Sequence, residues 1–262
     1  GEPICTLTNV STGPTGRDRL NGVSLSLCAG EIVAIAGVSG NGQVALADLL
    51  CGVRNASTGQ VTLRGATLQA RPAYLVSQGV ARIPEDRHAV GVVGDLPVWE
   101  NAVAERLRGP WFAHPWFRAF WVKRRAARQH AQRVAETFDV RGGGPDTPAR
   151  SLSGGNMQKL ILGRALMPPK DAAGYTAPAP QLIVAHQPTW GLDIGAVMFV
   201  QRQLINARDA GAAVLLISDD LDEVLALGDR VAVMHDGQLS EARRAEDWTR
   251  EAIGLAMAGA AH

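Results

Sequence analysis

The sequence has almost no excess of charge, few cysteines and no long apolar run. It contains 26 Lys and Arg against 25 Asp and Glu among 262 residues, a formal net charge of +1. Nucleic acid is therefore not expected as a partner, because binding a phosphate backbone needs a basic surplus. No apolar run approaches the ~20 residues that cross a bilayer. The odd number of cysteines (Cys5, Cys28 and Cys51) predicts reduced, intracellular thiols and not a disulfide framework.

Aromatic residues are also scarce, and no aromatic residue precedes Tyr74. Six of them lie within eleven residues: Trp111, Phe112, Trp116, Phe117, Phe120 and Trp121. We interpret these six as an aromatic packing cluster. A docking surface for a partner is the alternative, because aromatic side chains are enriched in interface cores. The basic residues that follow are predicted to form a solvated helix face: Lys123, Arg124, Arg125 and Arg128.

Short apolar and alternating runs predict an α/β fold. The run Glu31–Ala36 ends in a glycine-rich segment, and a helical pattern follows over Gln43–Leu50; strand, glycine loop and helix form the unit that holds phosphates. The other predicted strands are Ile4–Val10, Val23–Cys28, Gln60–Leu63, Leu182–Ala185, Val214–Ile217 and Val231–Met234. Helical patterns over Ile194–Arg208 and Leu221–Leu227 alternate with the later strands, which predicts a mostly parallel sheet.

The stretch from Val98 to Leu166 is different, because it lacks β-type runs and is rich in helix-forming residues. We therefore predict a single domain over residues 1–262, in which a helical lobe (98–166) is inserted into a β-rich lobe (1–97 and 167–262). The Ala- and Pro-rich segment Lys170–Pro180 is predicted to be a peripheral surface loop. The chain opens at Gly1 and not at Met, so we expect it to be a piece of a longer protein.

The first glycine-rich motif has the glycine spacing of a phosphate-binding loop. Its glycines allow backbone N–H groups to face a phosphate, and the helix that follows adds its dipole. The candidate binding residues are Gly37, Ser39, Gly40, Asn41, Gly42, Gln43 and Val44. A complete motif would end in Lys followed by Ser or Thr, and this chain has Gln43 and Val44 at those positions.

The second glycine-rich motif, Leu152–Lys159, begins a helix that is predicted to run to Leu166. A serine hydroxyl, two glycine N–H groups and a helix N-terminus together form an anion site. The candidate residues are Ser153, Gly154, Gly155, Asn156 and Gln158.

The third motif is Leu182–Asp193, in which an apolar run leads into Pro-Thr and then Gly-Leu-Asp. In this order the three motifs resemble the phosphate loop, the signature and the Walker B and D-loop block of ABC-type ATPases. The resemblance covers nearly the whole chain, and Asp193 matches the D-loop aspartate. It implies an ABC-type nucleotide-binding domain with a RecA-like, mostly parallel sheet, an N-terminal antiparallel β subdomain and a helical lobe.

Several positions depart from the pattern of this family. His186 stands where the family has the Mg²⁺-side Asp, and Gln187 stands where it has the catalytic Glu. Glu85 takes the place of the Q-loop glutamine, and Asp219 that of the switch histidine. No aromatic residue is available to stack on adenine before the loop. We therefore predict a degenerate site that binds nucleotide weakly or not at all, and an isolated chain that is inactive or nearly so. A metal site formed by Glu85, His186 and Asp219 is the alternative.

Within the family, the chain resembles the second, degenerate half of tandem ATPases of bacterial importers for nucleosides or simple sugars, and it is nearer to the nucleoside branch. This resemblance implies that the signature acts in trans, on ATP and Mg²⁺ held by an intact partner cassette. It also implies a membrane permease as a partner and a peripheral location on the cytoplasmic face of the bacterial inner membrane. A non-transport pseudo-ATPase that regulates or scaffolds remains the alternative. A DNA-repair or ribosome-associated ATPase would need a coiled-coil insert or a basic surface.

Overall fold

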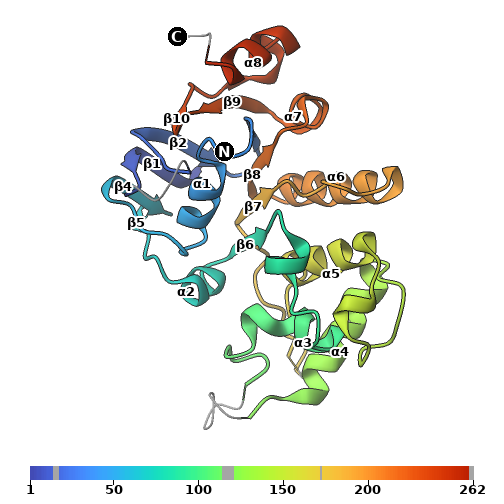
Figure 1. Ribbon diagram of the computed structural model, residues 1–262. Helices are drawn as coiled ribbons and strands as arrows, with labels where there is room; N and C mark the ends of the chain where they lie inside the picture. The colour runs from blue at the N-terminus through green and yellow to red at the C-terminus, as the bar shows by residue number, and fades with distance from the viewer. Residues whose placement is uncertain (14–17, 114–120, 172, 260–262) are drawn as a thin grey trace. The chain divides into compact units, whose positions relative to one another are not determined.

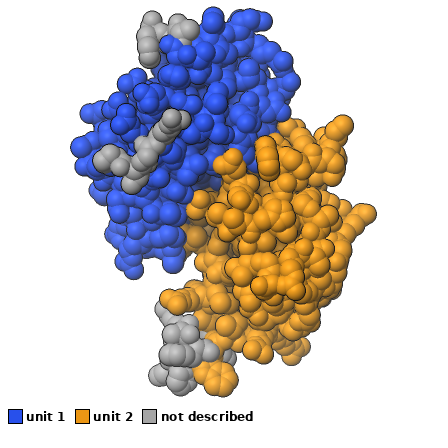
Figure 2. Space-filling view, viewed as in Figure 1, with its two compact units in different colours: residues 1–75, 181–187, 204–262 blue, residues 76–180, 188–203 orange. Residues whose placement is uncertain are grey.

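The computed structural model describes residues 1–13, 18–113, 121–171 and 173–259. These residues form two compact units (Figure 2). Unit 1 comprises residues 1–75, 181–187 and 204–262, and unit 2 comprises residues 76–180 and 188–203. The predicted helical lobe, 98–166, lies wholly within unit 2, and unit 2 extends beyond it at both ends.

Unit 1 begins with an antiparallel sheet, as the resemblance implied. Its strands lie in the order β2-β1-β4-β5. Their bounds are β1 Pro3–Ser11, β2 Val23–Cys28, β4 Thr58–Leu63 and β5 Ala66–Thr67. Leu7 of β1 is opposite Leu25 on one side and Val61 on the other, and all three side chains are buried. One face of this sheet therefore packs into the core of the unit.

A parallel sheet forms the centre of unit 1 (Figure 1), with neighbouring strands in the order β9-β3-β8-β7. The strands are β3 Ile32–Ala36, β7 Leu182–His186, β8 Ala213–Ser218 and β9 Arg230–His235. Every residue of β3, β7 and β8 is buried. Strands of this kind read as continuous apolar runs, which is why the sequence alone located them. Two short antiparallel strands, β10 Gln238–Leu239 and β11 Arg243–Arg244, pair with β9.

The helices of unit 1 pack on this sheet. α1 Gln43–Leu50 contacts β7, α7 Leu221–Leu227 contacts β3 and β8, and α8 Arg250–Met257 contacts β9. The bounds of α1 and α7 agree with the prediction from sequence. The sequence reading did not identify α8, α2 (Pro72–Ser77) or the strand β6 (Val80–Ile83), whose residues belong to unit 2.

Unit 2 is mainly helical. After β6 come the π-helix η1 Arg87–Gly91, α3 Val98–Val103, the short turn η2 Ala104–Arg106, α4 Arg124–Thr137, η3 Ala149–Ser151 and α5 Gly154–Leu166; α6, Ile194–Asp209, begins in this unit. Helices α3, α4 and α5 contact one another. Gly163 permits the close approach of α4 and α5, because a Cβ there would lie 2.4 Å from Cγ1 of Val134. The buried Asn101 holds the loop before α3 by accepting from Val93 N and donating to Val93 O.

The aromatic cluster is only partly a packing core. Phe112 is buried, whereas 65% of Trp121 is exposed. Trp111 stacks on Tyr175 of the predicted surface loop at 5.8 Å between ring centroids, so this loop packs against the aromatic segment of the same unit. Trp116, Phe117 and Phe120 lie outside the described residues. Of the predicted solvated face, Arg124, Arg125 and Arg128 are exposed on α4, whereas Lys123 is half-buried before this helix and donates to Pro110 O.

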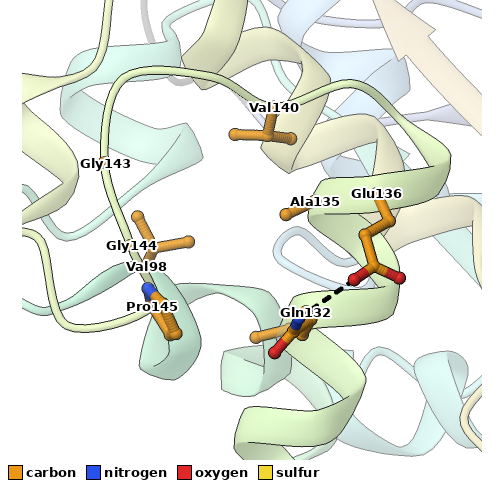
Figure 3. Close-up of a pocket in the computed structure, with 9 residues that line it drawn as sticks. Val98, Gln132, Ala135, Glu136, Val140, Gly143, Gly144 and Pro145 are labelled. Carbon is orange, nitrogen blue, oxygen red and sulfur yellow. Dashed lines mark hydrogen bonds between the residues drawn. The ribbon is translucent and has the colours of Figure 1, made fainter.

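A small pocket of about 260 Å³ lies in unit 2 beside α4 (Figure 3). Val98, Val140 and Pro145 contribute apolar surface to it, and Gln132 donates a hydrogen bond to Glu136 at its edge. Among the described residues, none of those that line this pocket belongs to the signature motif. In the described part of the chain, no helix combines the length and the apolar character that crossing a membrane requires.

The core of unit 2 contains a histidine that is held neutral. His130 is 1% exposed, and its ring lies 5.3 Å from that of Phe112. Burial, together with the smaller effect of the positive charges of Arg133 and Arg106, lowers the pKa of His130 from 6.5 to about 4. Because the unfolded chain binds this proton more readily, protonation favours unfolding between these two pH values.

We predict that the free energy of unfolding is highest above pH 6.5 and falls by roughly 2–3 kcal/mol as the pH decreases toward 4. Replacing His130→Leu should remove most of this slope, whereas His88→Leu at an exposed histidine should keep it. Denaturant unfolding at several pH values measures both. An unchanged slope in the His130 variant would contradict the assignment.

Candidate functional site

The first glycine-rich motif forms the predicted loop between β3 and α1. Gly40 and Gly42 adopt left-handed conformations, with φ of +89° and +117°. A Cβ at Gly42 would lie 2.8 Å from both Arg19 O and Met234 Sδ, so only glycine fits the start of α1. Ser39 and Val44 are exposed, whereas Gly37 is buried. The strand, loop and helix that the sequence predicted are therefore present.

The side chain of Gln43 closes this loop from within. It is 3% exposed and folds back over the turn that precedes it. Its Oε1 accepts from Asn41 N at 2.9 Å, and its Nε2 donates to Val38 O at 2.7 Å. A Cβ at Gly37 would lie 2.6 Å from that Nε2, so the glycine provides the space for the amide. The backbone N–H of Asn41 in this loop is thus already hydrogen-bonded to the side chain of Gln43.

Asn41 fastens the loop to the turn after β9. Its Oδ1 accepts from Asp236 N at 3.0 Å, and its carbonyl accepts from Gly237 N at 2.8 Å. Its Nδ2 donates to Val38 O at 2.8 Å. The loop is therefore held at its tip as well as at its base.

The carboxyl ends of β7 and β8 bring together three of the predicted site residues, His186, Gln187 and Asp219. His186 ends β7, Gln187 follows it, and both are buried. Gln187 has a φ of +49°, its N donates to Ile217 O at 2.8 Å, and its Oε1 accepts from Asp219 N at 3.5 Å. Glu85 belongs to unit 2. Among the described residues, no three His, Cys, Asp or Glu side chains are grouped so that they could hold a metal ion.

The second glycine-rich motif begins α5, as predicted. Ser153 is the N-cap of this helix, and its hydroxyl oxygen accepts from Nδ2 of Asn156 at 2.9 Å and from Asn156 N at 3.4 Å. The side-chain oxygen of Asn156 accepts from Arg141 N at 2.7 Å, which ties the helix start to the preceding loop. A Cβ at Gly155 would meet only Ala196 Cβ at 3.5 Å and Asp193 Oδ2 at 3.8 Å, which are ordinary contacts.

Two side chains hold the D-loop segment of unit 2, Gln158 from α5 and Arg87 from η1. The buried Gln158 donates from Nε2 to Pro188 O at 2.7 Å. The guanidinium of Arg87 donates to Trp190 O at 2.8 Å and to Gly191 O at 3.4 Å. The sequence analysis did not select Arg87; its position after Pro84-Glu85-Asp86 was the only signal. Asp193 starts α6, because its Oδ1 accepts from Ala196 N at 3.0 Å.

Comparison with known proteins identifies the family. The sequence model of the ABC transporter family matches residues 20–172, so the chain belongs to this family. It is 40% identical to the glucose import ATP-binding protein of Haloferax volcanii, over 99% of this chain and 45% of that protein. It is 37% identical to the guanosine import ATP-binding protein of Bacillus subtilis, over 99% of this chain and 48% of that protein. The chain thus spans about half the length of these relatives.

Solved structures agree with this assignment. A nucleotide-free ATP-binding cassette from an ABC transporter matches 96% of this chain and 95% of its own, with a TM-score of 0.75 and 25% identity. A dimeric ATP-binding cassette bound to ADP and phosphate shares the fold, with a TM-score of 0.71 over 92% of this chain and 98% of its own, at 20% identity. The predicted fold class is therefore confirmed.

We predict that Gln158→Leu lowers the free energy of unfolding by about 1–3 kcal/mol, because the buried Pro188 carbonyl then has no donor. Gln132→Leu is the matched control, since Gln132 is exposed and its partner Glu136 is exposed as well; its effect should stay within about 0.5 kcal/mol. Chemical denaturation of the two variants makes the comparison. Equal losses would show that the bond to Pro188 contributes nothing specific.

Proposed function

We propose that this chain is the energy-coupling cassette of an ABC importer for nucleosides or simple sugars, with an idle phosphate loop of its own. Its signature, Ser153–Gly155, completes an ATP site whose phosphates and Mg²⁺ are held by an intact partner cassette. The observation that carries the proposal is the amide of Gln43, which occupies the loop from inside.

The loop lacks the groups that neutralise a nucleotide. A lysine at position 43 would supply a cation to the β- and γ-phosphates, and a serine or threonine at position 44 would supply a hydroxyl to Mg²⁺. Gln43 is neutral and Val44 is apolar. Because Gln43 also accepts from Asn41 N, a phosphate would have to displace a hydrogen bond that is already satisfied.

The ends of β7 and β8 lack the groups that activate water. Gln187 cannot accept a proton, and the loss of a general base typically costs about 10²–10⁴ in rate. Its amide oxygen instead faces Asp219 N. The carboxylate of Asp219 adds a negative charge at the position that the family gives to a histidine, and it would repel a terminal phosphate.

The signature motif, in contrast, keeps the serine and the two glycines that form an anion site at a helix start. The first-turn N–H groups of α5 and its dipole favour an anion at Gly154 and Gly155. Beside this helix start, Trp190, Ile194 and Met198 are 63%, 80% and 60% exposed at intervals of four residues. An apolar row of this kind is typical of a surface that a partner covers.

The importer assignment rests on the named relatives, which serve glucose and guanosine import. Because the chain spans about half their length, we further propose that it is one half of a tandem protein, and that the other half is the intact partner cassette. The assembly would couple to permease subunits at the cytoplasmic face of the membrane.

We predict that the double variant Gln43→Lys, Val44→Thr binds ATP at least about tenfold more tightly than the parent chain, a gain of about 1.4 kcal/mol. The change removes the amide bridge and supplies both a cation and a hydroxyl. Hydrolysis should stay at background, because Gln187 is unchanged. Calorimetric titration of ATP with Mg²⁺ measures the affinity, and phosphate release measures turnover; equal affinities would show that something other than the loop limits binding.

We predict that Gly155→Asp lowers solute uptake by the complete transporter about 10²–10³-fold, since a carboxylate would face the partner's terminal phosphate. Gly155→Ala is the steric control, because the space around Gly155 accepts a Cβ within this chain. Gln43→Ala should leave uptake within a few-fold of the parent. If Gln43→Ala were as damaging as Gly155→Asp, the loop would have a direct role in the cycle.

A further inference from the structure

Arg87 is a buried cation that lies beside the first residue of the signature helix α5. It begins η1 and is 8% exposed. Its guanidinium donates to two backbone carbonyls, Trp190 O and Gly191 O, in the turn before Asp193. Arg87 therefore joins the segment after β6 to the D-loop within unit 2.

Among the residues that the structure describes, no carboxylate contacts the guanidinium of Arg87 directly. Within the described residues Arg87 forms no ion pair, and its Nε is buried without a hydrogen-bond partner. The neighbouring Asp86 carboxylate is exposed and accepts from Ala89 N and His88 N; these two bonds are the main cause that lowers its pKa, and the charge of Arg87 is the smallest. Buried arginines are ordinarily paired, because an uncompensated charge is costly away from water. A group that brings an anion to this place would remove that cost.

The unpartnered side of the guanidinium lies against the signature. A Cβ built at Gly154 would lie 3.4 Å from Nε and 3.6 Å from Nη2 of Arg87. Gly154 is the first residue of α5, a helix of 13 residues whose N-terminus is itself an electropositive site. Two independent sources of positive potential, a helix N-terminus and an unpaired buried guanidinium, thus meet at one glycine.

We propose that Arg87 is a positioning residue of the signature site. Its charge adds to that of the α5 N-terminus in attracting the terminal phosphate of ATP, and its two donated bonds hold the Trp190–Gly191 turn beside that phosphate. This inference rests on the proposed function, in which the signature faces ATP bound by a partner cassette. It adds a residue that lies outside the three recognised motifs.

The test is inhibition of the complete transporter's ATPase by orthovanadate, which mimics the transferring phosphate. Arg87→Gln keeps a donor for the Trp190 carbonyl but loses the charge, and should raise the half-inhibiting vanadate concentration about tenfold or more. Arg87→Lys keeps the charge and should stay within about threefold of the parent. If the half-inhibiting vanadate concentration rose equally in Arg87→Gln and Arg87→Lys, or stayed normal in both, the charge of Arg87 would have no role.

Two controls keep the result interpretable. Arg87→Met is a second neutral variant, and thermal unfolding of each purified transporter reports assembly. If both neutral variants fail to assemble while Arg87→Lys assembles, Arg87 serves folding alone and the inference is wrong. Gly155→Asp separates the two proposals: full ATPase activity in that variant would refute the proposed function, whereas its loss together with normal Arg87 variants would refute only the inference.

Discussion

Backbone N–H groups at the start of a helix need an acceptor, and the two glycine-rich helix starts of this chain meet that need in different ways. In the loop before α1 the acceptor comes from inside, because Gln43 folds back onto Asn41 N, whereas α1 itself has no side-chain cap. At α5 the cap comes from Ser153, and an unpaired guanidinium lies against the next residue, Gly154. The first site is closed by its own amide, whereas the second keeps an excess of positive potential.

Much of the fold could be predicted from the sequence, because its strongest signals are local. β3, β7 and β8 are fully buried parallel strands, so each is a short continuous apolar run. The helices α1 and α7 follow immediately after glycine or aspartate residues that mark a helix start. β6 and α8 were missed because their signals are weak: β6 has only four residues, one of them an arginine, and α8 is rich in small residues.

The candidate site could be predicted only as a set of residue types. The motifs located Gln43, Gln187 and the signature, since spacing along the chain is enough to find them. The inward fold of Gln43 depends on a side-chain rotamer and on the space at Gly37, which no local pattern encodes. The hydrogen bond from Arg87 to Trp190 O joins positions that are 103 residues apart in the sequence, so the role of Arg87 could only emerge from the three-dimensional structure.

The central claim is that the nucleotide acts on the signature of this chain and not on its loop. A high-resolution structure of the complete transporter, trapped with ATP, Mg²⁺ and vanadate, tests it most directly. The account predicts the partner-bound phosphates against Ser153, Gly154 and Gly155, with the Gln43 amide still bridging Asn41 and Val38. A nucleotide whose phosphates are cradled by Gly37–Val44 of this chain, with Gln43 displaced, would contradict it.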